Sequence, residues 1–186
     1  MDASTPRAVI VHRSTDYDLL LARHATRGQA EFFLRTREQD IDVVEEEHRC
    51  IHEVMASLLG QIPQRWRRAD VMRDDLDRFL FEPNDVVFAV GQDGLVANIA
   101  KYVTGQLVIG VNPLPERFDG VLVRIAPEQI SDLVATLSEG RDPEVQSRTM
   151  VRAQLDDSQS LLALNEVFVG QRTHQSARYR ICLLYT

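Results

Sequence analysis

The fold is decided by the stretch Val86-Val87-Phe88-Ala89-Val90-Gly91-Gln92-Asp93-Gly94-Leu95-Val96-Ala97-Asn98. It begins as an apolar run of strand length and ends as a segment that suits a helix, with a glycine turn between them. Such a turn lets the backbone approach a ligand closely, and the N-terminus of the following helix directs free N–H groups towards an anion. The stretch therefore predicts a phosphate-binding loop at the carboxyl end of a strand.

The neighbouring segments extend this unit to an α/β fold. Leu107–Val111 is a second buried-type strand, so residues 85–111 predict a βαβ unit with parallel strands. Residues 8–12 and 66–71 predict further strands, and apolar periodicity predicts helices from Asp16 to about Gly60 and over 127–137. Gly60 is expected to cap the first helical region, with Pro63 beyond it. We expect a parallel-sheet nucleotide-binding domain over residues 1–142.

Beyond the polar segment 138–143 the pattern changes to β. Residues 149–155, 161–169 and 179–185 predict strands. Residues 143–186 are too few to hold a core of their own, so they either pack on the first part or begin a β domain. The apolar ending at residues 181–186 favours the first strands of a β domain that is truncated at its C-terminus. The last strand would then present an open edge, and we expect a homo-oligomer that associates through it.

Composition excludes several classes of protein. Lys and Arg total 21 and Asp and Glu total 28, so the formal net charge of the 186 residues is −7. This balance excludes a general nucleic-acid binder but leaves small anionic ligands open. Cys50 and Cys182 form no disulfide framework and no CxxC pair. The chain contains neither a signal peptide nor an apolar run of the ~20 residues that a membrane span requires, so we expect a cytoplasmic protein without a membrane partner.

Asp93 is the informative residue of the turn. A carboxylate beside a phosphate repels it, and the arrangement makes sense if Asp93 acts on the ligand as a base or through a bridging metal. The alternative is an ordinary turn in which Asp93 caps the helix. Neither the GxGxxG dinucleotide fingerprint nor the GxxxxGK[ST] phosphate loop is present.

Three motifs together resemble the NAD kinase family, in particular bacterial members similar to the mitochondrial type. They are Val90-Gly91-Gln92-Asp93-Gly94, Val108-Ile109-Gly110-Val111-Asn112, which continues through Gly120, and Ala163-Leu164-Asn165-Glu166-Val167. Their order and approximate spacing match, and the resemblance covers most of the chain. The family usually reads GGDGT at the first motif, where this chain has Gln92 and Leu95 in place of a glycine and the threonine.

The resemblance implies a function and a site. Asp93 would take the proton from the adenosine ribose 2′-hydroxyl of NAD, and the γ-phosphoryl group of ATP would transfer to that oxygen. The implied nucleotide-binding residues are Gly91, Gly94, Gly110, Asn112, Asn165 and Glu166. Phosphoryl chemistry adds a divalent metal, most simply Mg²⁺, although the sequence shows no dedicated cluster of metal ligands.

Other interpretations of these residues remain open. The enzyme could be a lipid kinase of the diacylglycerol or sphingosine type, which shares a GGDG-type loop, or the chain could be a non-catalytic nucleotide-binding module. Asn165 and Glu166 could form a β-bulge or a solvated face. Arg13 follows the first strand and could meet a phosphate or lie on the surface. His48 and His52 are four residues apart on a helix, but two metal ligands are too few, so we interpret them as a solvated face.

Overall fold

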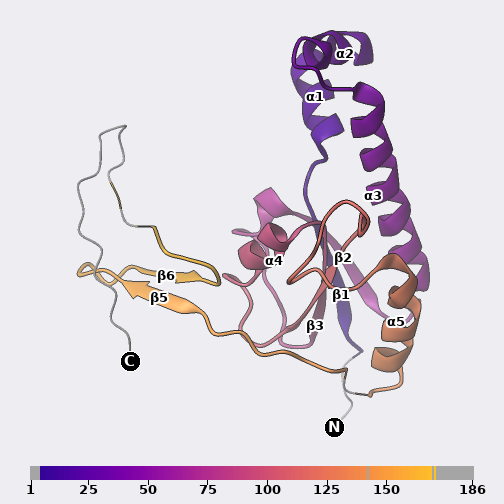
Figure 1. The fold of residues 1–186 in the computed structure, drawn as a ribbon. Coiled ribbons are helices and arrows are strands. Elements are labelled where there is room, and N and C mark those ends of the chain that lie inside the picture. The colour runs from indigo at the N-terminus through magenta and orange to yellow at the C-terminus, as the bar shows by residue number, and fades with distance from the viewer. Residues whose placement is uncertain (1–4, 142, 169, 171–186) are drawn as a thin grey trace. The chain divides into compact units, whose positions relative to one another are not determined.

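A computed structural model describes residues 5–141, 143–168 and 170 (Figure 1). The chain divides into two compact units, residues 1–147 and 148–186. The first unit has a parallel sheet with helices on both faces, and the second contains a small antiparallel hairpin. The predicted α/β class is therefore confirmed.

The sheet of the first unit has four parallel strands. They are β1 (Arg7–His12), β2 (Arg67–Met72), β3 (Asp85–Val90) and β4 (Leu107–Val111), in the order β2-β1-β3-β4. Every residue of β3 is buried, because this strand is central and both of its faces are covered. The strands predicted from the apolar runs at 85–90 and 107–111 are confirmed at the same residues.

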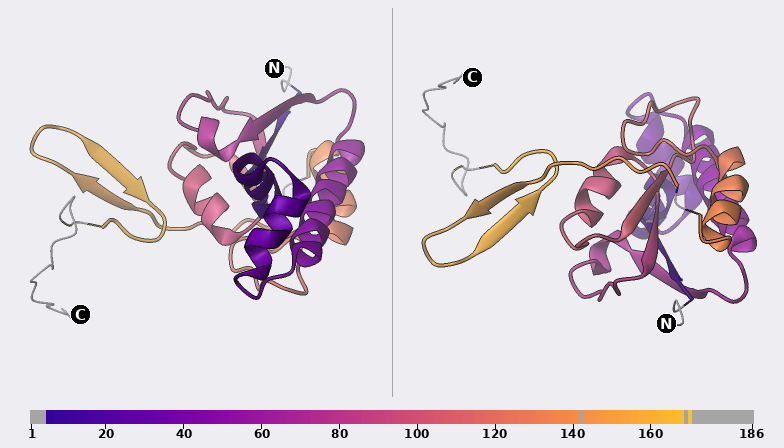
Figure 2. Two further views of the ribbon diagram at one scale, coloured as in Figure 1. Left: turned by 90° about the horizontal axis from the view of Figure 1, so that it is seen from above. Right: turned by 90° about the horizontal axis from the view of Figure 1, so that it is seen from below.

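Helices cover the two faces of the sheet unequally. The helices are α1 (Asp16–His24), α2 (Arg27–Arg35), α3 (Ile41–Gln61), α4 (Asp93–Ile99) and α5 (Ile130–Ser138), with short 3₁₀ turns at Arg73–Asp75 and Pro127–Gln129. Figure 2 shows α3 and α5 on one side of the sheet and α4 on the other. The helical region predicted from residue 16 to about 60 is thus three helices, and the predicted βαβ unit is β3-α4-β4.

The two faces hold two separate cores. On one face Ile10 and Phe88 pack with Leu58 of α3 and Ile130 of α5. On the other face Val9 and Val87 pack with side chains of α4 such as Ile99. A two-sided parallel sheet explains why these strands are continuous apolar runs in the sequence instead of alternating patterns.

The first half of α3 extends beyond the sheet, where α1 and α2 pack against it (Figure 1). We call these three elements the helical arm. A third small core of Ala30, Leu34 and Ile41 holds the arm together. Thr15 starts α1 with a capping box, in which its side chain accepts from the Asp18 N–H and its own N–H donates to the Asp18 carboxylate.

The second unit contains β5 (Val151–Gln154) and β6 (Ser160–Ala163), which pair as an antiparallel hairpin. Both strands fall where residues 149–155 and 161–169 predict them, although each is shorter than expected. The strand predicted at 179–185, and with it the expected edge for self-association, lies outside the described residues.

The predicted cap at Gly60 is wrong. The helix α3 continues to Gln61, and Ile62 ends it in an extended conformation with φ −65° and ψ 126°. The physical reason is Pro63, whose ring disfavours the helical conformation for the residue before it. The proline therefore ends the helix, and glycine is not needed for this purpose.

The amino edge of the sheet contains a buried ion pair that yields a testable prediction. Arg7 donates from Nε to Asp85 Oδ1 at 2.9 Å and from Nη2 to Oδ2 at 2.6 Å, and the Asp85 side chain is fully buried. Replacing Arg7 by Met leaves a buried carboxylate without its cation, so we expect the free energy of unfolding to fall by roughly 3–5 kcal/mol. Urea denaturation measures this loss.

Arg67→Met is the matched control for Arg7→Met. Arg67 pairs with Glu82 on the surface, where both side chains are exposed and water screens the interaction. We expect a much smaller loss of stability for this variant. Equal losses in the two variants would contradict the structural role assigned to the Arg7–Asp85 pair.

Candidate functional site

A crevice lies at the carboxyl edge of the sheet. It is lined by the segments that follow β1, β3 and β4 and by the middle of α3, and its cavity has a volume of about 70 Å³ and opens to solvent. Arg13 and Thr15 come from the first segment, Gly91 and Gln92 from the second, and Asn112 from the third. Residues distant in the sequence therefore meet where the three strands end.

The topology explains why a crevice forms at this place. The neighbouring strands β1 and β3 continue in opposite directions along the sheet, β1 to β2 and β3 to β4. The connection after β1 places α3 on one face, and the connection after β3 places α4 on the other. The chain thus leaves two adjacent strand ends towards opposite faces of the sheet, and a cleft opens between them. Other open α/β sheets bind ligands at such a switch point, where the strand order reverses.

Asp93 is the first residue of α4, and its carboxylate holds a backbone segment. Oδ1 accepts hydrogen bonds from the N–H groups of Leu122 at 2.7 Å and Val123 at 3.0 Å, and Oδ2 accepts one from Val121 at 3.0 Å. We call residues 121–123 the anchored segment. The alternative in which Asp93 caps the helix is wrong, because Gln92 occupies the cap position and no side chain caps this helix.

These contacts decide the charge of Asp93. Partial burial opposes ionisation, but the hydrogen bonds from Leu122, Val123 and Val121 outweigh it and hold the pKa of Asp93 below its ordinary value. The carboxylate is therefore ionised at neutral pH. A carboxylate with a lowered pKa is a weak proton acceptor, so it suits the orientation of a hydroxyl better than strong base catalysis.

Gly110 lets the anchored segment lie against β4. A Cβ atom at Gly110 would collide with the carbonyl oxygen of Leu122 and would lie 2.7 Å from Val123 Cα. No side chain fits at this position. Gly91 has another requirement, since its φ of +154° is a conformation that favours glycine in the turn after β3.

Asn112 organises the loop that follows β4. Its side chain is buried, its Nδ2 donates to the Phe118 carbonyl at 2.7 Å, and its Oδ1 accepts from the Leu114 N–H at 3.0 Å. Both polar ends of this amide are satisfied by the loop. Asn112 therefore shapes the wall of the crevice, and the nucleotide binding that the resemblance implies for it stays a prediction.

The structure brings only some of the predicted site residues together. Gly91 and Asn112 line the crevice, whereas Asp93 and Gly110 act behind its wall through the anchored segment. Gly94 is exposed in the first turn of α4 with open space around its Cα. Asn165 and Glu166 belong to the second unit, where both are exposed just after β6, and their predicted contact with NAD stays a prediction.

The positions that depart from the family motif have different environments. Leu95 is buried in the core beneath α4, so it is a packing residue, while Gln92 is exposed at the mouth of the crevice. Sequence reasoning missed Thr15 and Phe118, which also line the crevice. The signal for Thr15 was the capping-box pattern at residues 15–18, and Phe118 lies within the second motif, which continues through Gly120.

Comparison with known proteins adds no assignment. A scan against protein-family models finds no match for this chain, and neither does a search of curated protein sequences. The family resemblance therefore rests on the three motifs alone. Among the described residues, no helix combines the length and the apolar character that crossing a membrane requires.

The anchoring role of Asp93 predicts a pH-dependent effect of Asp93→Asn. The amide keeps one oxygen but turns an N–H₂ group towards a backbone N–H, so we expect a loss of roughly 1–2 kcal/mol in unfolding free energy at pH 7. The folded pKa lies below the unfolded value of about 4. The stability from the carboxylate is thus present above this pH and is lost as the pH falls through the folded value.

Urea denaturation between pH 7 and pH 2 tests this expectation. The difference in unfolding free energy between the natural chain and Asp93→Asn should become smaller as the pH falls. Asp77→Asn is the control. This substitution makes the same chemical change at an exposed carboxylate that does not hold the anchored segment. If this difference in unfolding free energy does not change with pH, or if Asp77→Asn shows the same difference, then Asp93 does not hold the anchored segment as described.

Gly110→Ala and Gly94→Ala form a second pair. The methyl group at residue 110 must displace the anchored segment, which we expect to cost roughly 1–3 kcal/mol of stability. The same group at residue 94 meets open space within a helix and should be neutral or should add about 0.5–1 kcal/mol. Urea denaturation of both variants compares them, and a stable Gly110→Ala would contradict the close approach of the two segments.

Proposed function

We propose that this protein binds a nucleotide in the crevice and is a NAD kinase-like phosphotransferase, moving the γ-phosphoryl group of ATP to the adenosine ribose 2′-hydroxyl of NAD. The observation that carries the proposal is the position of the crevice, which lies at the switch point of a parallel sheet. Open α/β sheets bind their ligands there. The three motifs favour NAD and ATP among the nucleotides.

The lining of the crevice suits a nucleotide. Arg13 carries a positive charge at the mouth, and its nearest carboxylate, on Asp16, is 3.9 Å away, so the guanidinium is only weakly paired and can bind a phosphate. Phe118 and Leu114 supply an apolar wall for a base. Thr15 offers a hydroxyl, although its proton is directed to the Asp18 carboxylate.

In this proposal Asp93 is a positioning residue, because its carboxylate lies behind the wall of the crevice and holds the anchored segment. A carboxylate has about four acceptor positions, and the anchored segment uses three of them. Asp93 therefore acts through the anchored segment and the loop that this segment holds, and it does not itself line the crevice. Phosphoryl transfer passes through a loose transition state in which positioning and electrostatics contribute most, so a strong base is not required.

The phosphoryl donor would bring a divalent metal such as Mg²⁺. Mg²⁺ is usually held by one or two carboxylates together with phosphate oxygens and water. Of the two carboxylates that line the crevice, Glu47 is paired with Arg117, and Asp16 is exposed and weakly paired. Asp16 therefore fits as the side chain that would hold the metal, whose chemistry is to neutralise charge on the phosphates.

A second candidate is a nucleotide-binding module without catalysis. The observation that favours it is the hydrogen bonding of both Asp93 oxygens to the chain's own backbone, which accounts for this residue without a substrate. The buried Leu95 at the position where the family has a threonine points the same way. Both candidates require nucleotide binding, and only the first requires turnover.

Calorimetric titration with ATP, NAD and adenosine tests the binding. We expect Arg13→Ala to weaken the affinity for ATP and NAD by roughly 10–100-fold, the worth of a charge-assisted hydrogen bond, and to leave adenosine unaffected. Arg35→Ala is the matched control, because Arg35 is an equally charged exposed side chain on α2, outside the crevice. A saturating nucleotide should also raise the melting temperature by mass action.

A coupled assay for NADP formation from ATP and NAD then separates the two candidates. Binding with turnover supports the phosphotransferase, and binding without turnover supports the non-catalytic module. If neither nucleotide binds at millimolar concentration, or if Arg35→Ala weakens binding as much as Arg13→Ala, the crevice is not a nucleotide site and both proposals fail.

A further inference from the structure

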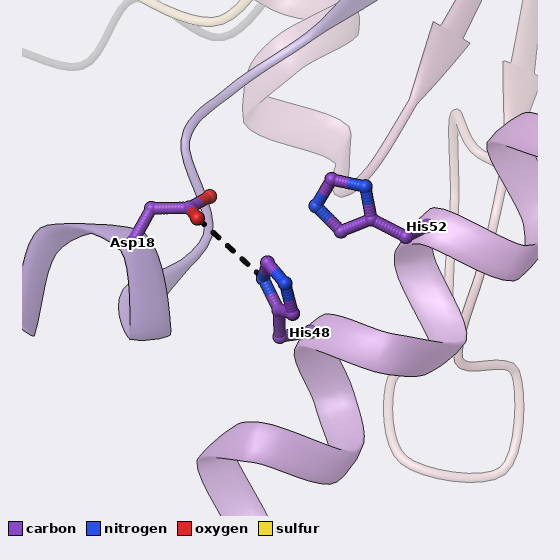
Figure 3. A group of neighbouring side chains, drawn as sticks. All are labelled: Asp18, His48 and His52. Atoms are coloured by element: carbon purple, nitrogen blue, oxygen red, sulfur yellow. Dashed lines mark ion pairs between the residues drawn. The ribbon is translucent and has the colours of Figure 1, made fainter. Parts of the chain in front are cut away.

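Three side chains on the helical arm form a group outside the sheet. His48 and His52 lie one turn apart on the same face of α3, and Asp18 in the first turn of α1 faces them (Figure 3). One ring nitrogen of each histidine and one carboxylate oxygen lie within 4.8 Å of one another. Packing of α1 against α3 thus adds a third potential ligand to a histidine pair that the sequence alone left incomplete.

We propose that Asp18, His48 and His52 bind a transition-metal ion of the Zn²⁺ class, with water completing the coordination. Two imidazoles and one carboxylate are a common ligand set for zinc, and three protein ligands plus water is the arrangement of open zinc sites. Mg²⁺ prefers an all-oxygen shell, so it is not the ion expected here. This site is therefore distinct in chemistry from the metal that phosphoryl transfer would use.

The distances suit such an ion. Tetrahedral ligands with bonds of about 2.1 Å lie about 3.4 Å apart. His48 Nδ1 and Asp18 Oδ1 are separated by 3.6 Å, which is already close to this ligand-to-ligand distance. His52 is exposed, so its ring can turn towards the other two ligands without repacking the core. The ring centroids of His48 and His52 are 4.2 Å apart.

Asp18 is held in place by a neighbour. Thr15 donates to Asp18 Oδ2 from its backbone N–H at 2.9 Å and from its hydroxyl at 2.8 Å, which leaves Oδ1 directed to His48. Hydrogen bonds of this kind orient the ligands of metal sites. His48 Nδ1 also contacts Thr15 Oγ1 at 2.7 Å, so the ring would exchange this contact for the metal or bind through its other nitrogen.

The surrounding charges favour a cation. Acidic side chains of α3, including Glu45 and Glu53, line the shallow groove around the histidines. Arg49, in the same groove, is paired with Glu46 and Glu53. The capping box of α1 holds the Asp18 carboxylate beside the two histidines, so the third ligand is already in place.

Calorimetric titration of the metal-stripped, nucleotide-free chain with Zn²⁺ tests the proposal. We expect one ion per chain, and we expect His52→Gln and Asp18→Asn each to weaken its affinity at least about tenfold. Glu53→Gln is the matched control, since it removes one negative charge from the same groove without removing a ligand, and it should change the affinity less than about twofold. Mg²⁺ should give no saturable binding.

His52→Gln decides the outcome if Asp18→Asn disturbs the start of α1, because His52 is exposed and its replacement should leave the fold, measured by circular dichroism, unchanged. Two results would overturn the proposal. One is a natural chain that does not bind Zn²⁺ at micromolar concentration. The other is Zn²⁺ binding that survives His52→Gln at full strength, which would place the ion elsewhere in the chain.

Discussion

The hydrogen bonds between the Asp93 carboxylate and the backbone N–H groups of residues 121–123 are the constraint on which the crevice depends. They tie the start of α4 to the segment that follows β4. Since Gly110 has no side chain, this segment lies directly on β4, and Ile125 adds a parallel bridge beside Val111. The outer edge of β4 is partly covered in this way, and the loop that forms one wall of the crevice is held at both ends.

The same contacts limit what Asp93 can do chemically. An anchor needs an ionised carboxylate with its lone pairs occupied, whereas a strong general base needs a raised pKa and a free lone pair. The hydrogen bonds lower the pKa of Asp93, so this side chain is better suited to its structural role than to base catalysis. The proposed phosphotransferase would therefore act by positioning its substrates and neutralising charge, which are the main contributions in phosphoryl transfer.

The helical arm connects the crevice with the proposed metal group. His48 lines the crevice on one side and belongs to the metal group on the other. Its position follows from the packing of α1 and α2 on α3 around Ala30, Leu34 and Ile41. His48 is thus shared by the two places, so a substitution of this residue would alter both.

The strands β3 and β4, the glycine turn and α4 could be predicted from the sequence, because strands buried on both faces leave unbroken apolar runs and glycine marks the turn. The sequence also located Gly91 and Asn112 at the crevice. The direction of the Asp93 carboxylate, the need for glycine at residue 110 and the approach of Asp18 to the two histidines became visible only in the folded chain. The physical reason is that these contacts join segments far apart in the chain, so no local periodicity or spacing encodes them.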